Sequence, residues 1–312
     1  MIVKKLNIKD YQTENNVFLA PMAGYTDYAF RTLLLEQGVS LCFTELVSAK
    51  GIVYKNKGNE PLLFCGEDKD KTAVQIFGSE PYYMRKACES EELKDFKIVD
   101  INMGCPVPKI YKNGEGSALL KDVLKAESIV KECVKSGKII TVKIRTGMKV
   151  GDDVASEFSK MAENSGASLI TIHGRVRESY YSGEPDYNAI EKAKKSVNIP
   201  VIANGGIFTV EDADLMMNRT GADGIMLARG GVQDPFLVCK LINKQPSLSL
   251  KDFMLKHVKL REEHVKGKRA AIEFRKFVPY YFKGMQNVKE VKMKLLQSES
   301  IEEILNIIET SL

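Results

Sequence analysis

Eight short apolar segments alternate with amphipathic helical patterns over about 240 residues of this 312-residue chain. Alternation of strands and helices implies parallel strands joined by right-handed crossovers. Eight such units in one run favour a barrel over an open sheet, so we predict an α/β fold, a (β/α)8 TIM barrel. The predicted strands span residues 17–20, 41–44, 73–77, 98–101, 139–144, 169–172, 200–203 and 224–227. The predicted helices span residues 27–37, 46–55, 81–91, 117–136, 153–165, 186–196, 210–219 and 234–243.

The pattern changes near residue 245, where the strand signals stop. Residues 249–266, 268–285 and 289–311 carry apolar residues at three- and four-residue spacing, which predicts helices. We therefore predict two domains, a catalytic barrel over residues 1–244 and a small helical domain over residues 245–312. Residues 56–72 contain a glycine, a proline and a charged run, and we predict an excursion there, a hairpin at the mouth of the barrel.

The charge of the chain is mildly positive, with a formal net charge of +5, and the excess gathers near the C-terminus. Residues 256–294 contain 12 lysines and arginines against 4 acidic residues, a local excess of 8. A helical face exposed to solvent explains such a run, and so does a phosphate-bearing partner such as RNA.

The numbers and spacing of cysteine and histidine residues indicate the cellular compartment and argue against a metal centre. None of the six cysteines stands in a Cys-x-x-Cys arrangement, and the three histidines lack metal-ligand spacing, so we predict reduced thiols and no metal. No apolar run approaches the roughly 20 residues of a membrane span. The N-terminus also lacks the apolar core of a signal peptide. These features predict a cytoplasmic protein with no membrane partner.

Residues 98–106, with the sequence IVDINMGCP, place a cysteine directly after a predicted strand. Gly104 permits a sharp turn and Pro106 stops the strand, so Cys105 lies at its carboxyl end with Asn102 close by. The carboxyl ends of barrel strands are where active sites form. A buried cysteine packed in a turn is the structural alternative.

Two cations on the predicted fifth strand, Lys143 and Arg145, share one face because side chains alternate along a strand. Buried charges are unfavourable unless they are paired, so this pair favours an anionic ligand. Gln75, on the third strand, needs a hydrogen-bonding partner, which a heterocyclic ligand or a structural contact can supply. His173 ends the sixth strand among polar residues, and a core role stays open beside a ligand role.

Glycine pairs follow the seventh and eighth predicted strands. The two segments are Asn204-Gly205-Gly206 and Ala228-Arg229-Gly230-Gly231. Backbone N–H groups exposed at these positions form the usual phosphate site of (β/α)8 barrels. A phosphate there, with a polar ring over Gln75 and Lys143 and a cysteine facing the ring, fits flavin mononucleotide (FMN).

These residues together give the chain a resemblance to the tRNA-dihydrouridine synthase family. The matching stretches are PMAGYTD (21–27), VQIFG (74–78), DINMGCP (100–106), GSALL (116–120), KIR (143–145), IHGR (172–175) and NGG (204–206). They occur in order along the whole barrel, and the stretch around Cys105 together with the GSALL segment is the most specific. The helical tail is similar to that of the family in length and basic character.

The resemblance implies that reduced FMN, recharged by NADPH, converts uridine in tRNA to 5,6-dihydrouridine. A hydride passes from flavin N5 to C6 of the uracil, and Cys105 gives a proton to C5. The residues implied to line the flavin are Pro21, Met22, Ala23, Gln75, Lys143 and His173. Those implied at its phosphate end are Asn204, Gly205, Gly206, Ala228 and Arg229. We further expect Asn102, Arg145 and Arg175 to contact the substrate, and Lys268, Arg269, Arg275 and Lys276 to bind RNA.

The expected chemistry agrees with the residue types. A thiol with a pKa near ~8.5 is mostly protonated at neutral pH, so Cys105 can serve as an acid. The loop from Cys105 to Ser117, with hinges at Gly114 and Gly116, is expected to carry the thiol over a uridine flipped out of an RNA loop.

Three alternatives stay open. They are the same reaction on ribosomal RNA, a small-molecule flavin oxidoreductase of the dihydroorotate or dihydropyrimidine dehydrogenase kind, and a non-catalytic RNA-binding barrel. A small-molecule enzyme has no need of a basic helical domain. The complete series of Lys143, Cys105 and the glycine pairs argues against a barrel without catalysis.

Overall fold

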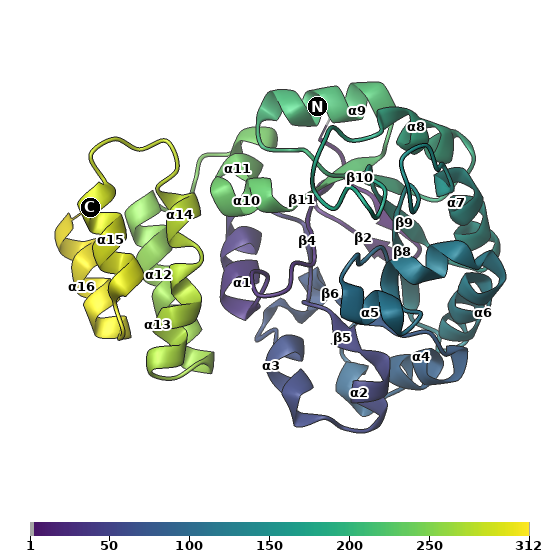
Figure 1. Ribbon diagram of the computed structural model, residues 1–312, viewed down its shortest axis with the longest axis horizontal. Helices are drawn as coiled ribbons and strands as arrows, with labels where there is room; N and C mark the ends of the chain where they lie inside the picture. The colour runs from purple at the N-terminus through teal and green to yellow at the C-terminus, as the bar shows by residue number, and fades with distance from the viewer. Residues whose placement is uncertain (1–2, 312) are drawn as a thin grey trace.

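A computed structural model of the chain describes residues 3–311, and its centre is a closed ring of parallel strands (Figure 1). The ring consists of β3 (Val17–Leu19), β4 (Leu41–Phe43), β6 (Thr72–Phe77), β7 (Ile98–Met103), β8 (Ile139–Arg145), β9 (Leu169–His173), β10 (Val201–Asn204) and β11 (Gly224–Leu227). It closes because β11 pairs with β3, and β4 pairs with β6. The predicted (β/α)8 barrel is therefore confirmed.

The interior of the barrel is packed with side chains at the amino ends of the strands. Every strand sends an apolar residue into one buried cluster, which contains Phe18, Leu41, Ala73, Ile98, Ile139, Leu169, Ile202 and Met226. A short hairpin of β1 (Asn7–Ile8) and β2 (Tyr11–Gln12), which was not predicted, adds the buried Ile8 to this cluster at the amino ends of the strands. The cavity of the barrel lies at the opposite, carboxyl ends of the strands.

Helices surround the ring and cover the outer faces of the strands (Figure 1). They are α1 (Tyr28–Gln37), α2 (Ala49–Val53), α4 (Pro81–Cys88), α6 (Val123–Val134), α7 (Ala155–Asn164), α8 (Tyr187–Lys195), α9 (Val210–Thr220) and α11 (Leu237–Leu241). Side-chain caps fix where several of them begin: Asp27 accepts from the Phe30 N–H at α1, and Thr209 with Asp212 forms a capping box at α9. Short helices α5 (Pro108–Lys112) and α10 (Arg229–Gln233) lie in the loops at the mouth.

Local structure corrects several predicted elements. The predicted hairpin over residues 56–72 is wrong, because this stretch forms two 3-10 turns (Lys57–Asn59 and Asp68–Lys71) around helix α3 (Glu60–Leu63). Pro61 lies at the start of α3, where a missing N–H costs nothing. The predicted helix 46–55 begins with a strand, β5 (Val47–Ser48), which pairs with β6. The predicted helix 117–136 divides into a 3-10 turn (Gly116–Lys121) and α6, because Asp122 caps the latter.

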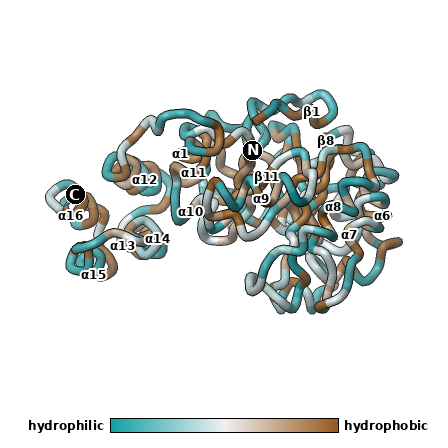
Figure 2. Tube along the Cα trace, turned by 90° about the horizontal axis from the view of Figure 1, so that it is seen from above, coloured by the Kyte–Doolittle hydropathy of each residue, from teal (hydrophilic) through white to brown (hydrophobic). Residues whose placement is uncertain are grey.

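Five helices follow the barrel and form a lobe at its side (Figure 2). They are α12 (Leu250–His264), α13 (Lys268–Arg275), α14 (Val278–Tyr281), α15 (Lys289–Gln297) and α16 (Ile301–Ser311), so each of the last two predicted helices is split in two. We keep the proposed domain boundary at residues 244/245, within the segment 242–249 that joins α11 to α12. Among residues 3–311, no helix has both the length and the apolar character needed to cross a membrane.

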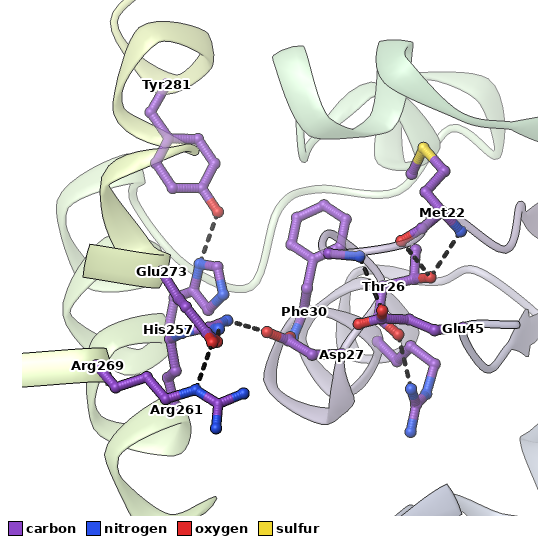
Figure 3. A network of polar contacts seen from close by, with 12 residues as sticks. Met22, Thr26, Asp27, Phe30, Glu45, His257, Arg261, Arg269, Glu273 and Tyr281 are labelled. Atoms are coloured by element: carbon purple, nitrogen blue, oxygen red, sulfur yellow. Dashed lines mark hydrogen bonds and ion pairs between the residues drawn. The ribbon is translucent and has the colours of Figure 1, made fainter. Parts of the chain in front are cut away.

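A buried arginine ties this helical lobe to the barrel. Arg261 of α12 is 3% exposed and pairs with Asp27 at the start of α1 and with Glu273 of α13 (Figure 3). Beside the ion pairs, the ring of Phe30 on α1 packs 5.3 Å from that of Phe277 and 5.8 Å from that of His257, measured between centroids. Apolar and ionic contacts together therefore fix the lobe on α1.

Replacing Arg261 tests this connection. We expect Arg261→Ala to lower the free energy of unfolding by about 3 kcal/mol, because half-buried Asp27 loses its ion-pair partner and Glu273 loses one of its two. The measurement is urea denaturation followed by circular dichroism. Arg269→Ala is the matched control, since Arg269 is 78% exposed and pairs with the same Glu273; its effect should stay below about 1 kcal/mol. Equal losses in the two variants would contradict a special role for Arg261.

Candidate active site

One cavity of about 300 Å³ opens at the carboxyl ends of the strands. The barrel residues predicted for the site all line it: Pro21, Met22, Ala23, Gln75, Asn102, Cys105, Lys143, Arg145, His173, Arg175, Asn204, Gly205, Gly206, Ala228 and Arg229. They come from five strands (β6 to β10) and from the segments that follow β3, β7, β9, β10 and β11, as parallel strands around a closed ring require. Three tyrosines that were not predicted for the site, Tyr25, Tyr181 and Tyr280, also line the cavity.

Cys105 faces this cavity and is 8% exposed. The Asn102 side-chain oxygen accepts from the Cys105 N–H at 2.9 Å and from the Gly104 N–H at 3.2 Å, which fixes the turn after β7. The Cys105 carbonyl accepts from the Ser117 N–H at 3.1 Å, so both ends of the predicted hinge loop are joined. Burial raises the pKa of the Cys105 thiol, which keeps it protonated at neutral pH.

A buried carboxylate begins the chain of hydrogen bonds that positions the turn at Cys105. Asp100 of β7 is fully buried and accepts from Thr141 Oγ1 and from Gln75 Nε2, each at 2.6 Å. Gln75 Oε1 in turn accepts from Asn102 Nδ2 at 2.8 Å. A continuous line of hydrogen bonds therefore runs from Asp100 through two side-chain amides to the backbone at Cys105, and it fixes which atom of each amide faces the cavity.

Sequence reasoning placed Asp100 in the motif but gave it no role. The available signal was a single acid within an otherwise apolar strand, because a carboxyl group in that environment needs donors close by. For Gln75, the structural contact considered as an alternative is present, since both ends of its amide are hydrogen-bonded to the protein. One amide hydrogen of Gln75 and one of Asn102 stay free for a ligand.

The cavity is strongly cationic. Lys143, Arg145, Arg175 and Arg229 line it, and none of the described residues that line it is an aspartate or a glutamate. Burial and the neighbouring Arg145 lower the pKa of Lys143 to about 8, and its Nζ donates to Asn204 Oδ1 at 3.0 Å. Burial and the surrounding cations hold the pKa of His173 well below its usual range, so its imidazole is neutral. Such uncompensated positive charge is suited to an anionic ligand.

Three arginines of the cavity hold one loop, residues 176–183. Arg145 donates to the carbonyls of Val176 (3.1 Å) and Tyr180 (2.8 Å), and Arg175 donates to Gly183 at 2.7 Å. In the same loop, the ring of Tyr181 contacts two guanidinium groups, with its centroid 5.7 Å from Cζ of Arg145 and 5.1 Å from Cζ of Arg229. Carbonyl groups and an aromatic face are neutral partners, so the arginines keep their full charge beside the cavity.

Backbone approaches closely at the ends of β10 and β11. Gly205 and Gly206 have φ values of +114° and +72°, a region that side chains disfavour. A Cβ on Gly230 would lie 2.0 Å from the carbonyl oxygen of Ile207, so no other residue fits there without moving the backbone. The two loops thus form a narrow cradle beside Arg175 and Arg229, with the size and charge that a phosphate group needs.

The four basic residues predicted to bind RNA lie outside the cavity lining. Lys268 pairs with Glu299 at 2.7 Å, and Arg269 pairs with Glu273 at 2.8 Å. Arg275 caps α15 by donating to the Ser298 carbonyl. Lys276 lies near the mouth, beside Tyr25. Within residues 3–311, no cluster of three or more histidine, cysteine or acidic side chains is arranged to hold a metal ion.

The Asp100 carboxyl group gives the folded protein a pH dependence that can be measured. Burial raises its pKa from near 3.8 to about 6, so its contribution to stability is present below about pH 4 and is lost as the pH rises through 6. Relative to Asp100→Asn, the wild type should lose about 3 kcal/mol of unfolding free energy between these values and then stay level. Urea unfolding across a pH series measures this.

The control is Asp95→Asn, at an exposed carboxylate whose pKa the Lys69 ammonium holds below its usual range. Its sign is opposite, because a lowered pKa adds stability as the pH rises. Identical pH profiles for the two comparisons would refute the assignment to Asp100.

Solved structures with a similar fold support the barrel and nothing finer. Histamine dehydrogenase from Rhizobium sp. 4-9 aligns with a TM-score of 0.56 and 14% identity over 82% of this chain. A 2-naphthoyl-CoA reductase aligns with a TM-score of 0.60 and 12% identity over 77% of this chain. The chain spans about half of each of these longer proteins, 50% and 52%.

Sequence comparison is far more specific. Residues 18–311 match the family described as Dihydrouridine synthase (Dus). A tRNA-dihydrouridine synthase B from Pasteurella multocida (strain Pm70) is 36% identical over 291 residues, which cover 90% of this chain and 88% of the relative. A probable tRNA-dihydrouridine synthase 1 from Synechocystis sp. is 34% identical and covers 96% of this chain and 87% of the relative. The cavity unites residues of six of the seven matching stretches, and the chain belongs to the dihydrouridine synthase family.

Proposed function

We propose that this protein reduces uridine in tRNA to 5,6-dihydrouridine, with FMN as bound cofactor and NADPH as electron donor. The observation that carries the proposal is the cavity itself. It combines a buried, protonated thiol with four cations and no carboxylate, in a chain of the dihydrouridine synthase family. Relatives named tRNA-dihydrouridine synthase support tRNA as the substrate.

The residues of the cavity fit FMN. The cradle formed by Gly205, Gly206 and Gly230 beside Arg229 suits its phosphate, since all four residues line the cavity and the tight packing at the three glycines leaves no room for a side chain. Lys143, held by Asn204, supplies positive charge for a ring that becomes anionic on reduction. The small residues Pro21 and Ala23 allow a flat ring to approach the backbone. Bound FMN, recharged by NADPH, would supply the hydride that adds to C6 of the uracil.

Cys105 completes the reaction. Once C6 carries the added hydride, negative charge lies on C5, C4 and O4 of the uracil, and C5 takes a proton. The S–H bond of Cys105 breaks, the proton goes to C5, and the sulfur keeps the electron pair until solvent protonates it. Burial, which raises the thiol pKa, ensures that the proton is present before the reaction and makes the thiolate easy to reprotonate.

The surrounding residues orient the substrate. The free amide hydrogen of Asn102 can donate to a uracil carbonyl, and Arg145 and Arg175 are placed to stabilise negative charge on the base and its phosphate. The uridine must leave its stack to enter a cavity that opens only at the mouth, and RNA loops make this inexpensive. We also propose a cytoplasmic location, which the six free thiols fit.

Cys105→Ala tests the proton donor. We expect the variant to keep its flavin and its RNA affinity, and to lose dihydrouridine formation by about 100-fold or more. Mass spectrometry of the RNA measures the product, and absorbance of flavin released on denaturation measures the cofactor. Cys133→Ala, at a buried thiol of α6 outside the cavity, is the matched control and should stay active. Undiminished turnover in Cys105→Ala would remove that residue from its role.

Two further measurements test the wider proposal, one of the bound cofactor and one of the RNA substrate. Purified wild-type protein should be yellow and release FMN. Dihydrouridine mapped in tRNA and in ribosomal RNA, from cells with and without this gene, should be lost from tRNA. Loss from ribosomal RNA alone would overturn the choice of substrate, and a colourless protein that FMN cannot reconstitute would overturn the enzyme.

The basic helices α12 to α15 are proposed to bind RNA phosphates. A double variant Lys268→Ala/Arg269→Ala avoids Arg275, whose capping of α15 would confound the result. We expect the slope of log affinity against log salt concentration to become shallower by about 1 to 2, because fewer counterions are released from the RNA on binding when phosphate contacts are lost. Fluorescence anisotropy with labelled tRNA measures it. An unchanged slope would place the RNA on another face.

A further inference from the structure

The helical lobe contributes directly to the cavity. Tyr280 of α14 lines the cavity beside Tyr25, which belongs to the loop after β3. Every other described residue of the lining lies between positions 20 and 230, in the barrel. Because β3 and β7 are three strands apart in the ring, this pair of tyrosines lies across the mouth from Cys105. The open edge of the cavity is therefore a seam between the two parts of the chain.

The two tyrosines form a fixed, uncharged wall. Their rings pack edge to face, with centroids 5.9 Å apart and an angle of 89° between the planes. Tyr25 packs in the same way against Phe277, at 5.4 Å and 80°. Burial and a hydrogen bond with Tyr280 raise the pKa of Tyr25 to about 12, so Tyr25 stays neutral.

A half-buried ammonium group lies directly beside this wall. Lys276 Nζ is 5.5 Å from the centre of the Tyr25 ring and 5.4 Å from that of Phe277. Within residues 3–311 it takes part in no ion pair. The carboxylates that act on it are engaged elsewhere: Glu45 accepts from the Gly24 N–H at 2.8 Å, and Glu273 pairs with two arginines.

The seam is held in place by the contacts that dock the lobe. Arg261 joins Asp27 to Glu273, and Asp27 caps the helix that begins directly after the Tyr25 loop (Figure 3). Tyr281, the neighbour of Tyr280, is buried and hydrogen-bonds His257 at 2.8 Å. The position of Tyr280 therefore depends on a rigid interface, and the wall is formed before any ligand binds.

We propose that this seam is a nucleotide subsite for the RNA strand that enters the cavity. Tyr280 and Tyr25 contact the sugar and base, and Lys276 binds the adjoining phosphate. The inference rests on the proposed function, because it takes RNA as the substrate. The helical lobe would then have a second role besides binding RNA outside the cavity, since without the lobe one wall of the cavity is missing.

The chemistry of the seam favours RNA over the dinucleotide that donates electrons. Aromatic side chains bind nucleotides of any sequence, and a lysine beside them satisfies the phosphate. Lys276 directly follows α13, whose Lys268 and Arg269 are proposed to bind RNA further along the same lobe. An RNA strand bound along α13 and entering the cavity would pass the seam. A nicotinamide dinucleotide has no such extension.

The test compares Tyr280→Ala, Tyr280→Phe and Lys276→Gln in the full-length flavoprotein. Substrate tRNA from cells lacking this gene gives kcat and KM for uridine reduction, and anisotropy gives the Kd of the same tRNA. NADPH-driven reduction of a dye measures turnover that needs no RNA. We expect Tyr280→Ala to raise KM and Kd about tenfold, with dye reduction within about twofold of wild type. Tyr280→Phe keeps the ring and should stay within about threefold on every measure.

Lys276→Gln should raise Kd and make the salt dependence of binding shallower by about 1. Tyr82→Ala is the matched control, because Tyr82 is 64% exposed and lies outside the cavity lining; it should match wild type. Unchanged KM and Kd in Tyr280→Ala would overturn the subsite, as would an equal loss of dye reduction, which would assign the wall to the electron donor. If the wild type makes no dihydrouridine but Tyr280→Ala and Lys276→Gln still weaken tRNA binding, the proposed function fails and the subsite stands.

Discussion

A fully buried carboxylate fixes the geometry of this site. Asp100 has no solvent contact, and it receives hydrogen bonds from Thr141 and Gln75 inside the barrel. Its presence leaves Gln75 only one orientation, with the side-chain oxygen toward Asn102. Asn102 is oriented in the same way, and its oxygen holds the turn that carries Cys105. The place of one thiol is thus set by a carboxyl group that lies outside the cavity lining.

Electrostatics divides the mouth of the barrel into two regions. On one side, four cations with no carboxylate among the described lining residues share the cavity with the cradle at the ends of β10 and β11. On the other side, neutral tyrosines from the barrel and the helical lobe face a single lysine. The three arginines are held by backbone carbonyls and an aromatic ring, and Lys143 by the Asn204 side-chain oxygen, instead of acids. This choice of partners keeps positive charge at the site at the expense of stability, a compromise that suits anionic ligands.

The barrel could be predicted because its strands are buried on both faces and are therefore written as short, continuous apolar runs. The two-residue strands β1, β2 and β5 are too short for any pattern, and Pro61 suggested a turn where it begins a helix. In the site, residues at strand ends were predictable because eight ends meet at one mouth. Asp100 lies inside a strand, and Tyr181 and Tyr280 come from a loop and a distant helix. Only the packing of these elements brings the three residues to the site.

The apolar cluster that fills the barrel at the amino ends of its strands limits how reactants can reach the site. Side chains from every strand of the ring, with Ile8 of the amino-terminal hairpin, close that end, so within residues 3–311 the cavity opens at the carboxyl ends of the strands. A dinucleotide and a folded RNA are both far larger than a chamber of about 300 Å³. Under the proposed function, NADPH and tRNA would therefore bind one after the other, and the first would dissociate before the second binds. The bound cofactor would stay reduced in the cavity between the two binding events.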